Sequence, residues 1–127
     1  MKYLGIDYGD KRVGVAVSDP QGQIAFPKTT LFNNQWLWKN LESLLAEEKI
    51  SLVVVGLPLG ADGNDTKQTV EVRNFAEGLK KITRIPIEFE NEMFTTRLVE
   101  KAGIKKRHAD ESAAALILQT YLDKLQK

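Results

Sequence analysis

The sequence contains no cysteine and a single histidine, His108. Without thiols there is no disulfide framework, no iron–sulfur cluster, no cysteine nucleophile and no thiolate zinc site. With one imidazole there is also no metal site built from several histidines. Any metal ion bound by this chain must therefore be held mainly by oxygen atoms.

Long apolar runs are missing as well. No stretch approaches the ~18 apolar residues that a membrane-spanning helix needs, and the N-terminus lacks the basic and apolar regions of a signal peptide. We therefore expect a cytoplasmic protein. Charge of one sign is not in excess either, since 18 Lys and Arg residues stand against 17 Asp and Glu residues. This balance argues against a uniformly basic surface but leaves local clusters of charge open.

What is present is a chain of 127 residues, which fits one domain over 1–127 with its own core. Apolar and β-branched runs predict strands at 2–7, 13–18, 24–32, 52–55 and 85–92. Helical spacing predicts helices at 34–48, 66–82 and 110–125, with a short helix at 95–102. Asn33 or Asn34 is the expected N-cap of the first helix. Leaving the short helix aside, the order βββαβαβα predicts an α/β fold with a mixed five-stranded sheet flanked by helices.

Asp7 stands where the first predicted strand runs into a glycine turn. An aspartate at the end of a strand is disfavoured unless something satisfies its charge. A metal ion would do so, and so would an Asx-turn formed with the amides around Gly9. Asp7 is thus a candidate metal ligand with a purely structural alternative.

Three glutamates alternate along the strand predicted at 85–92. Strand periodicity puts Glu88, Glu90 and Glu92 on one face. Acids in a row are typical of a solvated edge strand, which accounts for Glu88 and Glu90. Glu92 lies at the C-terminal end of the strand, where ligands usually bind in an open α/β sheet, and is a second candidate ligand.

Asp110 opens the last predicted helix, directly before small residues that permit close approach to the sheet. It is either the N-cap of that helix or a third acid of the same site. Carboxylates are the ligands that Mg²⁺ or Mn²⁺ prefers, and two bridged ions can activate water for phosphodiester hydrolysis. The three acids together suggest a metal-dependent nuclease, provided that the fold brings them together.

Basic residues gather just before Asp110. The cluster comprises Arg97, Lys101, Lys105, Lys106, Arg107 and His108. These side chains are either a solvated face or contacts for the phosphates of a nucleic acid. His108 either transfers a proton or is an ordinary surface residue.

The aromatic residues suggest no binding surface of their own. We expect Trp36, Trp38 and the phenylalanines to pack in the core or between helices rather than to stack on bases. The pattern leaves no obvious apolar seam for a two-fold dimer. The expected state is a monomer or a weak homodimer.

Three segments of the chain resemble the YqgF (RuvX) family. They are residues 4–19 (LGIDYGDKRVGVAVSD), residues 54–63 (VVGLPLGADG) and residues 110–123, which hold the motifs DESAA and ILQTYLD. Members of that family are described as Holliday junction resolvases and, more recently, as nucleases that mature the 5′ end of pre-16S rRNA. The resemblance implies their RNase H-like fold, in agreement with the order βββαβαβα.

The resemblance also assigns roles to residues. It places the family's catalytic, metal-binding acids on Asp7, Glu92 and Asp110, with Mg²⁺ or Mn²⁺ as the cofactor. It places the family's basic pair beside the first acid on Lys11 and Arg12. These two side chains either contact the nucleic-acid backbone or are simply charges of a hairpin turn.

The function implied by the resemblance is that of a metal-dependent nuclease, a hydrolase acting on ester bonds in pre-16S rRNA processing and ribosome biogenesis. Its partners would be structured nucleic acid and ribosomal precursor particles. A Holliday junction resolvase in DNA repair is one alternative. Another is a non-catalytic nucleic-acid- or ribosome-binding module, because Asn91 and Met93 replace the family's Asp and Arg on either side of Glu92. Actin-like ATPases also use an Asp-x-Gly turn, but they need two such lobes.

Overall fold

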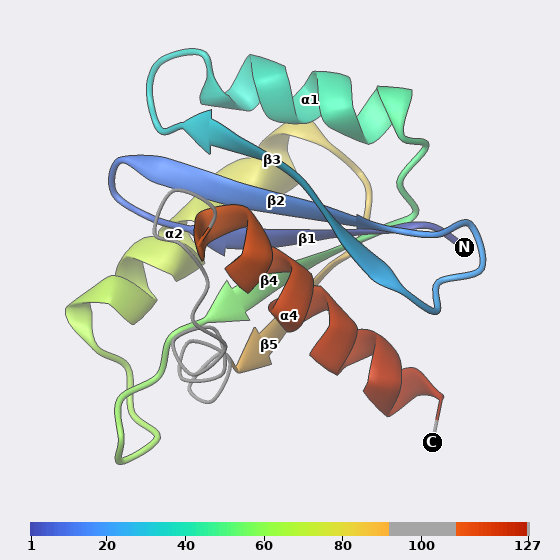
Figure 1. Cartoon of the computed structure of the whole chain (residues 1–127). Helices are drawn as coiled ribbons and strands as arrows, with labels where there is room; N and C mark the ends of the chain where they lie inside the picture. Colours follow the sequence, from blue (N-terminus) through green and yellow to red (C-terminus); the bar gives the residue numbers. More distant parts are fainter. Residues whose placement is uncertain (92–108, 127) are drawn as a thin grey trace.

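The computed structural model describes residues 1–91 and 109–126, with the backbone alone for Ala109 and Asp110. Five strands form one sheet in the order β3-β2-β1-β4-β5, with α1 and α2 on one face and α4 on the other (Figure 1). The strands are β1 (Tyr3–Tyr8), β2 (Arg12–Ser18), β3 (Ala25–Phe32), β4 (Leu52–Leu57) and β5 (Ile87–Asn91). The helices are α1 (Leu37–Glu47), α2 (Lys67–Ile82) and α4 (Ala109–Leu125). The predicted mixed five-stranded sheet and the order βββαβαβα are confirmed.

The sheet is antiparallel on one side and parallel on the other. β2 pairs antiparallel with β1 and with β3, whereas β4 pairs parallel with β1 and with β5. β4 is thus the central parallel strand that its unbroken apolar run predicts, and Val53, Val54 and Val55 are fully buried. Because β1, β4 and β5 run in the same direction, their C-terminal ends meet at one edge of the sheet.

Alternate side chains of the strands build a core on each face of the sheet. The larger core lies under α1 and α2, where the Phe75 ring stacks between Tyr8 at 4.4 Å and Trp38 at 5.4 Å. The smaller core lies under α4 and includes Val54 and Leu118. Among the described helices, none has the length and apolar character needed to cross a membrane.

The start of α1 differs from the prediction. The helix begins at Leu37, and its N-cap is Trp36, which makes no capping bond with its side chain. The two expected caps are used elsewhere. Asn33 Nδ2 donates to the carbonyl oxygen of Gly9 at 2.8 Å, and Asn34 Oδ1 accepts from the amide of Trp36 at 2.9 Å. These hydrogen bonds hold the residues between β3 and α1 in a turn, so the helix begins at Leu37 and not at residue 34.

Gly5 sets how closely α4 lies against β1. A Cβ at this position would lie 2.7 Å from the Cβ of Leu118 and 2.9 Å from the carbonyl oxygen of Ala114. Neither atom belongs to the flexible end of a side chain, so neither can move aside without moving the helix. Only glycine at this position permits the observed approach.

We expect Gly5→Ala to push α4 away from β1 and to lower the free energy of unfolding by about 1–3 kcal/mol, as overpacking does. Thermal unfolding of the two proteins measures the effect. Gly60→Ala is the control, because the contacts of a Cβ there would be wider: 3.1 Å to Oδ1 of Asp62, and 3.3 Å to the carbonyl oxygen of Asn64 and to the methyl group of Thr66. An unchanged Tm in Gly5→Ala would contradict the role given to this contact.

Candidate active site

Asp7 is placed by its two neighbours on β1. Ile6 is fully buried and Tyr8 stacks on Phe75, both in the core under α1 and α2. Because successive side chains of a strand point to opposite faces, Asp7 lies on the other face, the one that α4 covers. It is half-buried there, at the edge of the sheet where β1, β4 and β5 end.

The same face of β1 runs along α4 in the opposite direction. The ring of Tyr3 meets the ring of Tyr121 at 6.2 Å, and Gly5 lies under Ala114 and Leu118. Asp7 is two residues beyond Gly5, about 7 Å along the strand. The backbone of Asp110 is four residues before Ala114, about 6 Å along the helix. The first turn of α4 therefore lies at the level of Asp7.

Asp110 is the second residue of α4, since the helix begins at Ala109. Of the two alternatives for Asp110, the N-cap is therefore not the one observed, because the residue lies inside the helix. An acidic residue in the first turn of a helix interacts favourably with the helix dipole.

Glycines flank Asp7 on both neighbouring strands. Gly14 of β2 is its direct partner, and the pairing of Ile6 with Val55, continued by one residue, sets Gly56 of β4 beside it. Neither neighbour has a side chain. The two strands next to Asp7 therefore contribute only backbone atoms at this position, and close approach of another group to the carboxylate is not blocked by their side chains.

Glu90 continues this row across the sheet. It pairs with Gly56, which places its Cα about 10 Å from that of Asp7 by the strand spacing. Glu90 is only 4% exposed, and its Oε1 lies 2.5 Å from Nζ of Lys124 on α4. The prediction of a solvated edge strand is right for Glu88, which is exposed, and wrong for Glu90, because Lys124 covers it and neutralises its charge.

Several predicted site residues lie outside the described residues. They are Glu92, Arg97, Lys101, Lys105, Lys106, Arg107 and His108, together with the short helix expected at 95–102. Among the side chains that the structure describes, no three His, Asp or Glu come together in a group that could hold a metal ion. Of the three predicted acids, the structure thus brings the side chain of Asp7 and the backbone of Asp110 to one level.

Lys11 and Arg12 are exposed at the hairpin between β1 and β2. This hairpin lies at the same end of the sheet as Asp7, because Tyr8 pairs with Val13 directly beside it. The amide of Asn33 donates to the carbonyl oxygen of Lys11 at 2.9 Å, which ties the hairpin to the turn after β3. Both cations are thus held next to the candidate site.

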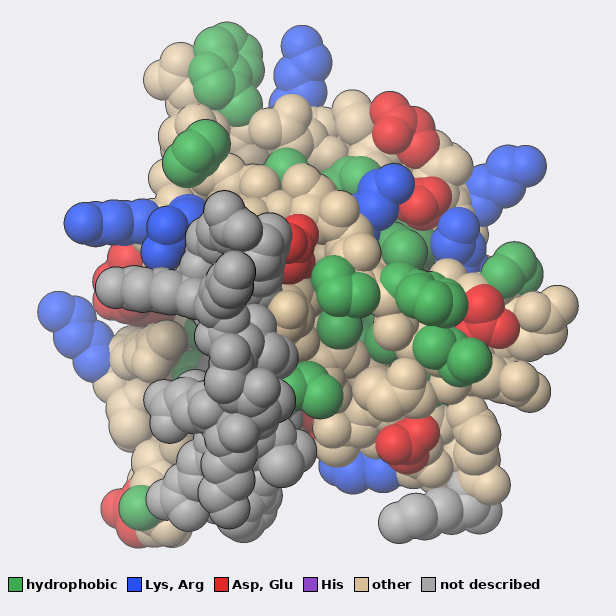
Figure 2. Space-filling view, viewed as in Figure 1, with side chains coloured by type: hydrophobic (Ala, Val, Ile, Leu, Met, Phe, Trp, Pro, Cys, Tyr) green, Lys and Arg blue, Asp and Glu red, His purple; other side chains and the backbone are tan. Residues whose placement is uncertain are grey.

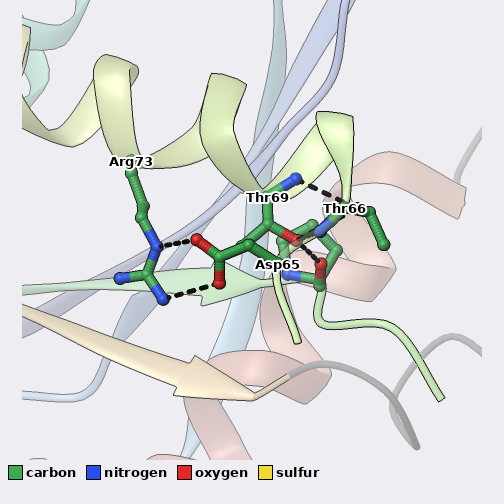
Figure 3. Close-up of polar contacts among 5 residues, drawn as sticks. Asp65, Thr66, Thr69 and Arg73 are labelled. Atoms are coloured by element: carbon green, nitrogen blue, oxygen red, sulfur yellow. Dashed lines mark hydrogen bonds and ion pairs between the residues drawn. The ribbon is translucent and has the colours of Figure 1, made fainter. Parts of the chain in front are cut away.

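The loop between β4 and α2 is fixed by a group of polar contacts that the sequence patterns did not predict (Figure 3). Thr66 and Thr69 form a capping box at the start of α2, and the Thr69 hydroxyl donates to the carbonyl oxygen of Pro58. Arg73 binds both oxygens of Asp65, at 2.8 and 3.1 Å, and lies over the ring of Phe89 on β5. The Thr-x-x-Thr spacing was the available signal for the cap.

Comparison with solved structures agrees with this architecture. A structure titled "T. thermophilus RuvC in complex with Holliday junction substrate" superposes with a TM-score of 0.67 at 14% identity, over 99% of this chain and 96% of that chain. The fowlpox virus resolvase in complex with Holliday junction DNA gives a TM-score of 0.58 at 14% identity, with both chains fully covered. The fold is therefore the RuvC type of the RNase H-like fold, as expected.

Sequence comparison gives the family. A family model described as "RuvX: Holliday junction resolvase" matches residues 1–124. A "Putative pre-16S rRNA nuclease" of Nitratidesulfovibrio vulgaris is 42% identical over 133 residues, covering 97% of this chain and 94% of the relative. A protein of the same description from Sulfurihydrogenibium sp. is 40% identical over 132 residues, covering 98% and 91%. The chain belongs to the RuvX (YqgF) family, which confirms the resemblance drawn from its motifs.

The Glu90–Lys124 pair yields a test of stability. Lys124→Met leaves a buried carboxylate without its cation, so we expect the free energy of unfolding in urea to fall by about 1–3 kcal/mol. Adding Glu90→Gln should restore most of the loss. Lys80→Met is the matched control, because its partner Glu77 is exposed. A Lys124→Met variant as stable as the control variant would refute the role of this pair.

The Asp65–Arg73 pair yields a test of pH dependence. The hydrogen bonds from Arg73, helped by its charge, lower the pKa of Asp65. Because the pKa of Asp65 is lowered in the folded state, its ionisation stabilises the fold at pH values above the ordinary pKa of an aspartate. This contribution is lost as the pH falls through the folded-state pKa. Wild type should therefore have a higher Tm than Asp65→Asn at pH 7, with the difference shrinking below about pH 4. Arg73→Gln should show the same trend, and a pH-independent difference would contradict it.

Proposed function

We propose that this chain is a metal-dependent nuclease that hydrolyses phosphodiester bonds of structured RNA, in the maturation of the 5′ end of pre-16S rRNA in the cytoplasm. The observation that carries the proposal is that Asp7 and the first turn of α4 lie at the same position along β1. The close contact at Gly5 makes this arrangement possible. The relatives described as pre-16S rRNA nucleases support RNA as the substrate. The description of the family model makes branched DNA the alternative.

The proposed metal ligands are Asp7, Glu92 and Asp110. In the sequence, Glu92 directly follows Asn91, the last residue of β5. Glu90 of the same strand lies in register with Asp7 across Gly56. Carboxylate oxygens fit Mg²⁺ or Mn²⁺, and the composition offers no thiol and only one imidazole as competing donors. When bound, two such ions would supply an activated water and charge stabilisation at the leaving oxygen.

The chain's own residues position the substrate around this centre. Ile6 and Tyr8, locked in the core, hold the carboxylate of Asp7 at a fixed height above the sheet. Lys11 and Arg12 contact phosphates next to the scissile bond, where they reduce the repulsion between the substrate and the acids. From the sequence alone, we propose the cations Arg97, Lys101, Lys105, Lys106 and Arg107 as further phosphate contacts, and His108 as a group that transfers a proton.

The family's Asp-Glu-Arg stretch is altered on both sides of Glu92. Asn91 is exposed at the end of β5, so its change from an acid removes a charge from a solvated position. Met93 removes a charge of opposite sign two residues later. We propose that the two changes compensate one another and leave Glu92 as a ligand.

The test is a cleavage assay with Mg²⁺ or Mn²⁺ on precursor 16S rRNA and, in parallel, on a four-way DNA junction. We expect the RNA to be the better substrate, EDTA to abolish cleavage, and Asp7→Asn to lower the rate at least about 100-fold, since even outer-shell changes at metal sites cost 10–100-fold. Asp10→Asn, an exposed acid on the same hairpin, is the control. Cleavage that persists in EDTA, or full activity in Asp7→Asn, would reject the proposal.

A further inference from the structure

Three of the described aromatic side chains lie in solvent although the sequence patterns predict that they are packed: Phe26 near the start of β3, and Phe32 and Trp36 on either side of the turn that follows β3. Phe32, the last residue of β3, is 70% exposed, and Trp36, just before α1, is 54% exposed. Trp38 and Phe75 do pack between the helices as expected. Large rings are normally the first groups to be buried, so two of them exposed on one short turn need a physical explanation.

The turn that carries the two rings is firmly held. The amide of Asn34 donates to the carbonyl oxygen of Phe32 at 3.1 Å, and the amide of Leu37 donates to the carbonyl oxygen of Asn34 at 3.1 Å. Asn33 bonds to the β1–β2 hairpin through its backbone amide at 2.9 Å and through its side chain at 2.8 Å. The rings are thus presented on an ordered backbone that is tied to the hairpin of Lys11 and Arg12.

Phe32 shares its face of the sheet with Asp7. Asp7 pairs with Gly14, Gly14 pairs with Thr30, and Phe32 is two residues further along β3. Two strand spacings and two residues of rise place the Cα atoms of Phe32 and Asp7 about 12 Å apart. The partner of Phe32 across the ladder is Arg12, so an aromatic and a cationic side chain leave the same face of the sheet from paired positions.

Figure 2 shows the same arrangement on the surface: hydrophobic side chains project over the end of β3 and the start of α1, and Lys and Arg side chains follow below them at the β1–β2 hairpin. Exposed rings interleaved with cations are the two components of surfaces that bind single-stranded nucleic acid. Charge complementarity with phosphate therefore favours a nucleic acid over an apolar protein partner.

We propose that Phe32, Trp36, Lys11 and Arg12 form an aromatic platform that stacks unpaired nucleotides of the substrate beside the cleavage site. This inference rests on the proposed nuclease function and narrows its substrate. In a duplex, the faces of each base are already stacked, so rings on the protein select nucleotides that are unpaired. The platform thus directs the enzyme to a junction between a structured region and a single strand.

The test measures the binding of a fluorescein-labelled single-stranded oligouridine in EDTA, where a metal-dependent enzyme cannot cut it. We expect Phe32→Leu and Trp36→Leu each to weaken binding roughly tenfold, because stacking on the ring is removed while apolar volume is kept. Phe32→Tyr keeps the ring and should keep the affinity. Phe26→Leu is the matched control, because Phe26 is 50% exposed at the opposite end of the same strand.

Two further measurements separate the components of the platform. Binding to an RNA duplex should change little in Phe32→Leu, because duplex bases cannot stack on the ring. Lys11→Ala should reduce the slope of log Kd against log salt by about 0.7 for each phosphate of a single strand that the lysine neutralises. Lys81→Ala, an exposed lysine near the C-terminal end of α2, should leave the slope unchanged.

The outcomes distinguish this inference from the proposed function. Equal affinity for oligouridine in Phe32→Leu and Phe26→Leu would overturn the platform, even if Asp7-dependent cleavage is observed. Ring-dependent binding together with no metal-dependent cleavage by wild type would keep the platform and reject the nuclease. A Phe32→Leu variant that changes only its sedimentation, with unaltered binding, would show that a second copy of the chain covers the rings and would overturn the inference.

Discussion

The contact between β1 and α4 at Gly5 is the constraint on which the rest of this structure depends. A helix axis normally keeps its distance from a sheet because side chains stand between them. Here the carbonyl oxygen of Ala114 and the Cβ of Leu118 occupy the place where any side chain at position 5 would begin. This contact closes the smaller core and also sets the height of the first turn of α4 relative to Asp7. Stability and site geometry therefore depend on the same few atoms.

The two faces of the sheet differ in what they bury. The face under α1 and α2 is closed by apolar residues and by the ring stack of Tyr8, Phe75 and Trp38. The face under α4 accepts charge, with Asp7 half-buried and Glu90 buried against Lys124. Carboxylates that are partly removed from water lower the stability of the face that carries them unless they are paired. The opposite face holds the larger hydrophobic core.

The sequence patterns predict the elements well because each depends on local information. The run from Leu52 to Val55 indicates a strand covered on both faces, and the structure has it at the centre of the parallel region. The errors concern what covers a side chain. Periodicity places Glu90 on the correct face but cannot show that Lys124, distant in the chain, lies over it. The packed position predicted for Trp36 is wrong because helical spacing does not reveal that the helix begins only at Leu37, which leaves Trp36 in the turn before it.

The sequence by itself determined the chemistry available to this protein. The lack of thiols and the single imidazole leave carboxylates as the main ligands available to any metal ion, and the motifs around Asp7 and Asp110 indicate the family. Only the tertiary structure decided that Asp7 and the first turn of α4 lie at the same position along the sheet, because this depends on how α4, distant in the chain, packs against β1. It also decided that Phe32 and Trp36 remain in solvent, since exposure is a property of the packed molecule and not of any segment alone.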